Sequence, residues 1–151
     1  MNSTLEDRFE IIDTATRMMW SIDTRDWEGL GDVFADKVVL DFTSYWGGEP
    51  QTATPEQVVT DWSALFTAFD ATQHLLGNHL VTVDGDQGVL TAVFQATHRL
   101  ADPFGNPLWT LGGTYRFSLV RIDNRWKIEH VLMTATWSEG NRNVLALAAA
   151  Q

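Results

Sequence analysis

The chain has 151 residues, a length typical of one domain with a sizeable core. Its formal net charge of −10 argues against binding to nucleic acid or to an anionic membrane surface, because both favour Lys and Arg. The absence of cysteine excludes disulfides, thiolate catalysis and Cys-ligated zinc. No run reaches membrane-spanning length, and the N-terminus lacks the basic and apolar regions of a signal peptide. We therefore expect a single cytoplasmic domain over residues 1–151.

The first part of the chain shows helical periodicity. Its pattern predicts a helix that runs to about Ile22 and places Asp23 at its C-terminal end, with Ser3 or Thr4 as N-cap. The expected apolar face consists of Leu5, Phe9, Ile12, Thr16, Met19 and Trp20. Asp26 is expected to cap a short second helix that continues to Phe34.

The next segment alternates between strand, loop and helix signals. Residues 37–42 are β-branched and alternating, which favours a strand, and residues 45–50 form an aromatic loop. Thr54, Pro55 and Gln57 provide an N-cap, a first-turn proline and a capping box for a third helix. Its expected buried side carries Val58, Trp62, Leu65, Phe66 and Phe69.

After this helix the apolar period changes to two. The predicted strands are Thr72–Asp84, Gln87–Leu100, Leu108–Ile122 and Arg125–Trp137, followed by a short helix within 141–151. Turns are expected at 84–86, 102–107 and 123–124, and Gly112-Gly113 is interpreted as a bend or bulge. Helices followed by a long meander indicate an α+β fold in which the helices pack on one face of a curved sheet. A curved sheet closed by helices forms a cone, and the apolar interior of the cone is suited to binding a small molecule.

Strand parity predicts which side chains line the cone. These are His74, Leu76 and Asn78, then Phe94, Ala96 and His98, then Trp109, Leu111, Gly113, Tyr115, Phe117 and Leu119. By the same rule His79 points away from His74, and His130 shares a face with Trp126, Ile128, Leu132 and Thr134. Among the tryptophans, Trp20, Trp27, Trp62 and Trp126 are expected in the core, and Trp46, Trp109 and Trp137 at a pocket or interface.

Asp23, His74 and His98 are the candidate catalytic residues. Ionisable groups on faces that should pack a core need a partner or a function. A carboxylate with two imidazoles in one apolar pocket could move a proton near neutral pH. The alternatives are structural: Asp23 as a helix-end carboxylate, and each histidine bonded to a neighbouring backbone group. Asp23, His74 and His98 could also form a facial metal site, but no second carboxylate lies nearby on the strands.

These residues resemble the NTF2-like, or SnoaL-like, superfamily, and most closely its scytalone dehydratase group. Bile-acid dehydratases and the hexachlorocyclohexane dehydrochlorinase resemble the chain more distantly. The similarity spans roughly residues 12–137. Its most specific pieces are Asp23–Trp27, Asp41–Tyr45, Thr72–His74, His98 and Asp123–Ile128. The resemblance implies a cone-shaped, mixed or antiparallel sheet packed by N-terminal helices, as in a cystatin-like α+β barrel.

The resemblance also implies roles for individual residues. The positions of Asp23, His74 and His98 match the acid/base residues of scytalone dehydratase, and the dehydrochlorinase keeps the matching Asp-His pair. Two tyrosines of the dehydratase correspond to Ile22 and Phe42, and its substrate-binding asparagine corresponds to Tyr115. The proton-transfer residues are therefore kept, while the residues that bind the substrate differ, which indicates a different substrate. Tyr45 or Tyr115 could supply a replacement phenol.

The expected activity is a cofactor-independent, dehydratase-like lyase, with an isomerase or cyclase as related options, acting on a small apolar carbonyl compound. Neither a metal nor another cofactor is expected. The expected substrate-binding residues are Tyr115, Tyr45, Phe42, Ile22, Phe94, Leu76 and Trp109. The alternatives are a non-catalytic ligand-binding or interaction protein and a subunit comparable to the β-subunit of a ring-hydroxylating dioxygenase. Apolar residues expected on the outer face, Val131, Met133 and Trp137, favour a homo-oligomer, and the resemblance favours a trimer over a dimer.

Overall fold

The computed structural model describes residues 4–101 and 104–150. The elements in chain order are α1 (Leu5–Thr24), α2 (Trp27–Asp32), β1 (Phe34–Asp41), α3 (Thr43–Trp46), β2 (Gln51–Ala53), α4 (Pro55–Phe66), β3 (Ala71–Asp84), β4 (Gln87–Arg99), β5 (Leu108–Ile122), β6 (Arg125–Gly140) and α5 (Asn143–Ala149). No helix in these ranges is long and apolar enough to cross a membrane. Of the turn expected at 102–107, the first two residues lie outside the described ranges.

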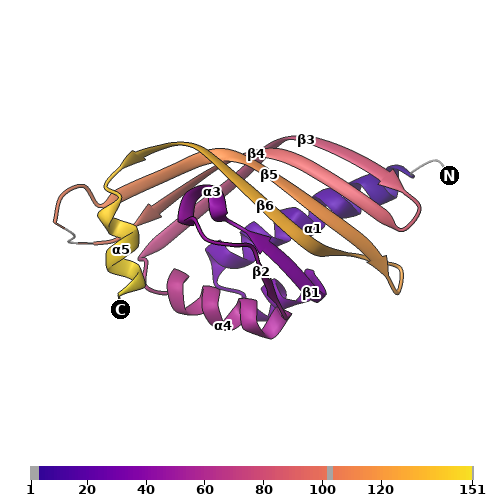
Figure 1. The fold of residues 1–151 in the computed structure, drawn as a ribbon, viewed down its shortest axis with the longest axis horizontal. Coiled ribbons are helices and arrows are strands. Elements are labelled where there is room, and N and C mark those ends of the chain that lie inside the picture. The colour runs from indigo at the N-terminus through magenta and orange to yellow at the C-terminus, as the bar shows by residue number, and fades with distance from the viewer. Residues whose placement is uncertain (1–3, 102–103, 151) are drawn as a thin grey trace.

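One six-stranded sheet organises the molecule. Its strand order is β2-β1-β6-β5-β4-β3, with β1 parallel to β6 and every other neighbouring pair antiparallel. The long strands arch over α1 and α4, and α5 lies at one end of the arch (Figure 1). The sheet is not closed on itself. The expected α+β fold, with a curved mixed sheet packed by helices, is confirmed.

Helix α1 begins and ends at defined caps. Thr4 and Asp7 form a capping box, and the left-handed conformation of Arg25, with φ of 60°, ends the helix. The buried stripe is Ile11, Ala15, Met18, Met19 and Ile22. The predicted face was wrong, because Leu5, Phe9 and Trp20 are 63–70% exposed. The pattern was ambiguous since apolar residues occur on two sides of this helix, and packing against the sheet selects one.

The segment between α1 and β3 contains more structure than predicted. Helix α2 ends at Asp32 and β1 begins at Phe34, so the predicted second helix was too long and the first strand too short. The predicted aromatic loop includes part of α3, and β2 follows it as a short edge strand. The capping box at the start of α4 is confirmed. Phe69, placed on α4 by periodicity, lies beyond the helix and is nevertheless buried.

Parity holds along β4 and β5. On β4 the buried side chains include Leu90, Phe94 and His98, and on β5 they include Trp109 and Tyr115, as predicted. The register of β5 on β6 shifts between Gly112 and Gly113, which confirms the expected bulge. A side chain at Gly113 would collide with the backbone of the neighbouring strand, since an added Cβ would lie 1.9 Å from the Thr134 carbonyl oxygen.

Two further bulges, in β3 and β6, exchange the faces of these strands, and the alternating pattern does not indicate them. In β3, Asn78 adopts a φ of 54° and the pairing with β4 shifts between Gly77 and Leu80. Asn78 is therefore exposed, and His79 and Val81 take the more buried positions expected of even-numbered residues. One extra residue exchanges the two faces of a strand. The predictions for Asn78 and His79 were wrong for this reason.

The same effect changes β6. Its register against β5 shifts between Ser118 and Leu119, so that Val131 and Met133 face the core. The second shift, between Gly112 and Gly113, exchanges the faces again before Trp137. Val131 and Met133, expected on the outer face, are 0% and 4% exposed, whereas Trp137 is 44% exposed. The predicted apolar outer surface therefore loses two of its three residues.

Candidate active site

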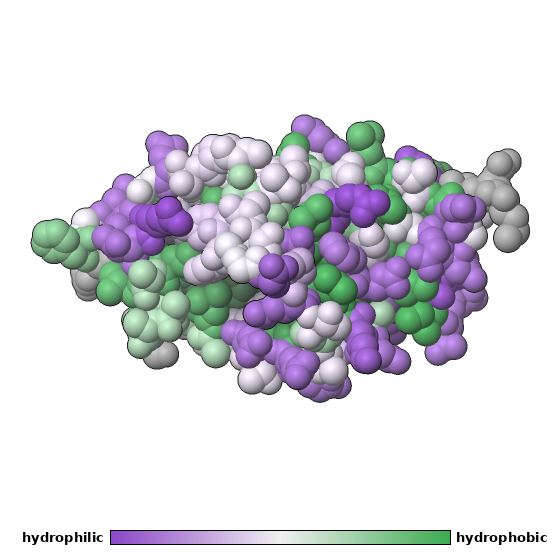
Figure 2. Space-filling view, in the orientation of Figure 1, coloured by the Kyte–Doolittle hydropathy of each residue, from purple (hydrophilic) through white to green (hydrophobic). Residues whose placement is uncertain are grey.

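A small apolar cavity lies inside the arch of the sheet, with a volume of about 120 Å³. Its lining comes from the sheet, from α1 and from α3, α4 and α5: Met18, Ile22, Phe42, Tyr45, Trp46, Trp62, Leu65, Phe66, His74, Phe94, Ala96, His98, Trp109, Leu111, Tyr115, Met133 and Leu145. Between α3 and α5 the surface is hollowed and largely apolar (Figure 2).

Most of the predicted site residues meet at this cavity. The residues that line it as expected are His74, His98, Ile22, Phe42, Tyr45, Phe94, Trp109 and Tyr115. Leu76 does not line it and instead packs, partly buried, against the core. Sequence reasoning missed Phe66 of α4 as a neighbour of both imidazoles, and it missed Leu145 of α5, which closes one side. Neither carries a chemical signature that a sequence could reveal.

Asp23 and His74 are in direct contact. Asp23 Oδ1 lies 2.7 Å from His74 Nδ1, and its side chain also accepts hydrogen bonds from the Thr72 hydroxyl, at 2.9 Å, and from the His74 backbone N–H, at 2.7 Å. The last turn of α1 disfavours negative charge, and these three donors offset that effect. Because a carboxylate only accepts, His74 Nδ1 carries a proton, and in the neutral imidazole Nε2 then holds a lone pair. Asp23 itself does not line the cavity, whereas its partner His74 does.

His98 is held by a neighbouring strand. Thr72, His98 and Trp109 face one another across β3, β4 and β5, and His98 Nδ1 lies 3.2 Å from the Trp109 carbonyl oxygen. Since that carbonyl only accepts, Nδ1 is the donor and Nε2 is again a lone pair. The imidazole stacks on the Trp109 ring with centroids 4.5 Å apart, and its centroid lies 5.1 Å from that of the Phe69 ring.

The two imidazoles differ in their ability to hold a positive charge. His98 is 5% exposed, and burial together with the neighbouring His74 lowers its pKa from 6.5 to about 4. The bond to the Trp109 carbonyl and the charge of Asp23 oppose this shift without cancelling it. His98 is thus neutral at physiological pH. His74, by contrast, has a carboxylate against Nδ1 that stabilises an imidazolium.

Two hydrogen-bond donors at the cavity have no partner. The Tyr45 hydroxyl and the Trp109 indole Nε1 are buried and unbonded within the described residues. Their rings are in contact, with centroids 5.5 Å apart. The Tyr115 ring contacts the rings of Phe94 and Phe117, and burial raises the pKa of its hydroxyl far above the usual value, so it stays a neutral phenol.

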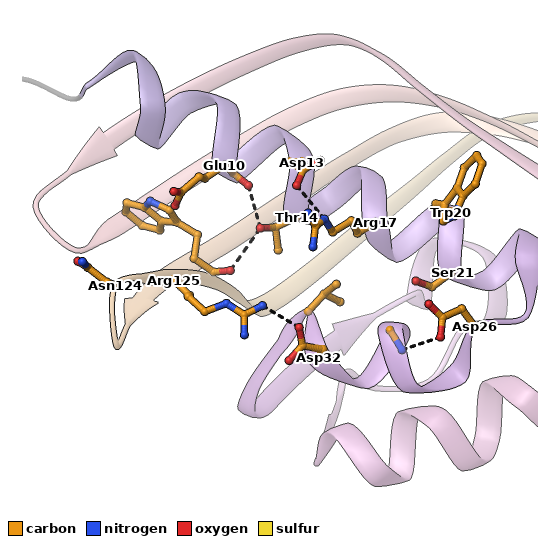
Figure 3. Close-up of a pocket in the computed structure, with 13 residues that line it drawn as sticks. Glu10, Asp13, Thr14, Arg17, Trp20, Ser21, Asp26, Asp32, Asn124 and Arg125 are labelled. Atoms are coloured by element: carbon orange, nitrogen blue, oxygen red, sulfur yellow. Dashed lines mark hydrogen bonds and ion pairs between the residues drawn. The ribbon is translucent and has the colours of Figure 1, made fainter.

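A second hollow, of about 440 Å³, lies on the surface between α1, α2 and the β5–β6 turn. Both arginines of its lining form ion pairs: Arg17 pairs with Asp13 at 2.8 Å and Arg125 with Asp32 at 2.7 Å (Figure 3). Its lining holds no histidine. Within residues 4–101 and 104–150 no group of three or more His, Cys, Asp or Glu side chains is arranged to hold a metal ion. The smaller, apolar cavity is therefore the candidate active site.

Comparisons with known proteins agree with this architecture. The model of the SnoaL-like domain matches residues 3–131. The structure of the Kfla4162 protein from Kribbella flavida is 30% identical, with a TM-score of 0.86, and the match covers 95% of this chain and 97% of that one. No curated protein matches the chain.

Two more distant structures share the fold. A candidate scytalone dehydratase from Novosphingobium aromaticivorans is 19% identical, with a TM-score of 0.77 and coverage of 91% and 89%. The hexachlorocyclohexane dehydrochlorinase LinA-type3 from Novosphingobium barchaimii is 15% identical, with a TM-score of 0.74 and coverage of 91% and 92%. The fold, the extent of the family match and the similarity to the Kribbella protein together show that this chain belongs to the SnoaL-like domain family of the NTF2-like superfamily.

Proposed function

We propose that this protein is a cofactor-independent lyase of the dehydratase type, in which the Asp23–His74 pair moves a proton beside a substrate carbonyl. The observation that carries this proposal is the 2.7 Å contact between Asp23 Oδ1 and His74 Nδ1, with the His74 side chain 7% exposed at the wall of an apolar cavity. The fold shared with a dehydrochlorinase and a candidate scytalone dehydratase adds support.

In the proposed reaction His74 acts first as base and then as acid. Its Nε2 takes the proton from the carbon beside the carbonyl, and Asp23 stabilises the imidazolium. The electron pair of the broken C–H bond enters the conjugated system as an enolate. His74 then returns the proton to the leaving hydroxyl, the C–O bond breaks, and an unsaturated ketone and water are formed. An isomerase or cyclase would share the first step.

Electrostatics favour His74 as the base and a different role for His98. A proton on His98 would be buried with no carboxylate against it, and its lowered pKa reflects this cost. Its only ring N–H is already bonded to the Trp109 carbonyl. His98 is therefore poorly suited to polarise the carbonyl or to protonate the leaving oxygen. The neutral tautomer instead suits it to accept a hydrogen bond from a substrate hydroxyl through Nε2.

The cavity limits the size of the substrate. A volume of about 120 Å³ is close to that of engineered cavities that accept benzene. Ile22, Phe42 and Phe94 present apolar surface, while Tyr45, Trp109 and Tyr115 add polar atoms to the same wall. A small apolar carbonyl compound, with a hydroxyl at the β position for a dehydratase, fits both the size and the chemistry of this site.

Deuterium exchange of simple ketones tests the proton transfer without knowledge of the natural substrate. Acetophenone or cyclohexanone in deuterated water should exchange protons beside the carbonyl in the presence of the wild-type protein, as followed by NMR. His74→Ala should lower this rate by about 10²- to 10⁴-fold. Asp23→Asn should come close to that loss, because an amide cannot stabilise the imidazolium.

His79→Ala provides the matched control, because it removes a histidine that does not line the cavity. It should retain wild-type exchange. Binding of these ketones with no exchange would refute the lyase proposal and favour the non-catalytic ligand-binding alternative. Full exchange by His74→Ala would refute the role of His74 as the base.

A further inference from the structure

The proposed elimination requires a hydrogen-bond donor for the enolate oxygen, and the histidines do not provide one. Both imidazoles donate through Nδ1 to groups outside the cavity, Asp23 in one case and the Trp109 carbonyl in the other. Only their lone pairs remain for the substrate. A carbonyl oxygen and an enolate oxygen accept hydrogen bonds and donate none. The donor must therefore come from elsewhere in the wall.

We infer that the Tyr45 hydroxyl and the Trp109 indole N–H together form the carbonyl-binding site of this cavity. This inference rests on the proposed function and completes it. Among the described residues, five buried side-chain atoms lack a hydrogen-bond partner: Tyr45 Oη, His79 Nε2, Trp109 Nε1, Arg121 Nε and His130 Nδ1. Only Tyr45 and Trp109 belong to residues that line the cavity.

The physical reason is the cost of burying an unpaired donor. Such an atom loses its hydrogen bonds to water and gains none, which is unfavourable unless a ligand supplies an acceptor. The two donors belong to rings that are in contact and that both line the cavity, and we assign one substrate oxygen to both of them. Donors fixed in advance around a developing negative charge are an effective source of transition-state stabilisation.

Local structure holds both donors in place. The Ser44 hydroxyl donates to the Met133 carbonyl at 2.9 Å and accepts from the Ala135 N–H at 3.0 Å, which fixes α3 and with it Tyr45. Trp109 lies on a central strand and is 3% exposed. The Arg142 guanidinium lies 4.9 Å from the centre of the Tyr45 ring, and its positive charge draws electron density from the ring and strengthens the hydroxyl as a donor.

The infrared carbonyl stretch of bound acetophenone tests this assignment. The probe can accept hydrogen bonds but cannot donate to either histidine, so its stretch reports only on donors. In the wild-type protein we expect a lower frequency than in an apolar solvent. Tyr45→Phe should raise the frequency and weaken acetophenone binding about 2- to 10-fold, the effect of losing one hydrogen bond.

The matched control is His79→Ala, which removes an unpaired buried polar atom outside the cavity and should leave the stretch unchanged. Tyr115→Phe tests the other phenol of the cavity as the competing donor. A shift in Tyr115→Phe with none in Tyr45→Phe would overturn the assignment, and so would a wild-type protein that does not bind acetophenone. The role of Trp109 is tested in the wild-type protein through the NMR resonance of its indole N–H. The loss of this resonance in Trp109→Phe identifies it. Addition of acetophenone should move this resonance downfield, and a fixed resonance would contradict the role of Trp109.

The outcome separates this inference from the proposed function. His74→Ala should keep the lowered carbonyl frequency while losing deuterium exchange, because binding the oxygen does not require the base. A wild-type protein that shows the frequency shift without exchange would support the carbonyl site and refute the lyase. Deuterium exchange without a frequency shift would support the lyase and refute the carbonyl site.

Discussion

The buried His98 makes the stability of the fold depend on pH. In the unfolded chain its imidazole has the ordinary pKa of 6.5, whereas in the folded protein burial lowers the pKa to about 4. As the pH falls below 6.5 the unfolded chain binds a proton that the folded protein does not. His98 therefore contributes stability fully above pH 6.5, and that contribution is lost as the pH falls toward 4.

The size of the loss follows from the two pKa values. Each pKa unit corresponds to about 1.4 kcal/mol, so the free energy of unfolding should fall by about 2 kcal/mol between pH 7 and about pH 5. The loss should reach about 3 kcal/mol near pH 4. The carboxyls of Asp7, Asp32 and Asp41 have pKa values below 3.8, so their contributions are lost at still lower pH and overlap little with this window.

Urea unfolding at several pH values measures the effect. The His98→Gln variant cannot bind this proton, so the difference in unfolding free energy between wild type and variant should shrink by about 2 kcal/mol from pH 7 to about pH 5. Comparing the two proteins at each pH cancels the titration of groups that they share. If their unfolding free energies stay parallel over this range, His98 is not a buried neutral imidazole, and its role as a hydrogen-bond acceptor fails with it.

Three further predictions concern cofactors, the β3 bulge and assembly. Ketone exchange should be unaffected by a strong chelator, because the proposed proton transfer uses only side chains; loss of exchange on chelation and its return with metal would contradict this. Asn78→Ala should lower the free energy of unfolding by about 1 kcal/mol and Asn78→Gly should not, since φ at this position is 54°. If urea unfolding shows that both variants lose the same free energy of unfolding, backbone strain at the bulge is contradicted. Light scattering should show a homo-oligomer, and a trimer rather than a dimer, because Leu75, Val93 and Trp137 remain exposed. Trp137→Glu should weaken this assembly. A wild-type monomer at micromolar concentration would refute the prediction.

The sequence determined those parts of the fold that depend on local chemistry. Capping residues such as Thr54 and Gln57 fix the start of α4 because they satisfy its free backbone N–H groups. Alternation along β4 placed Phe94 and His98 inside because no bulge interrupts the pairing of that strand with β5. The resemblance to a known family identified Asp23 and His74 as partners, 51 positions apart in the chain, and the structure brings them to 2.7 Å.

The tertiary structure decided what depends on contacts between distant residues. The bulges near Asn78 and Ser118 exchange strand faces, and a single inserted residue leaves almost no trace in an alternating pattern. The buried side of α1 was settled by its packing against the sheet. The tautomer and charge of His98 depend on the Trp109 carbonyl and on burial, and the unpaired state of the Tyr45 hydroxyl depends on what surrounds it. A sequence supplies the side chains, but only the fold determines which of their hydrogen bonds are left for a ligand.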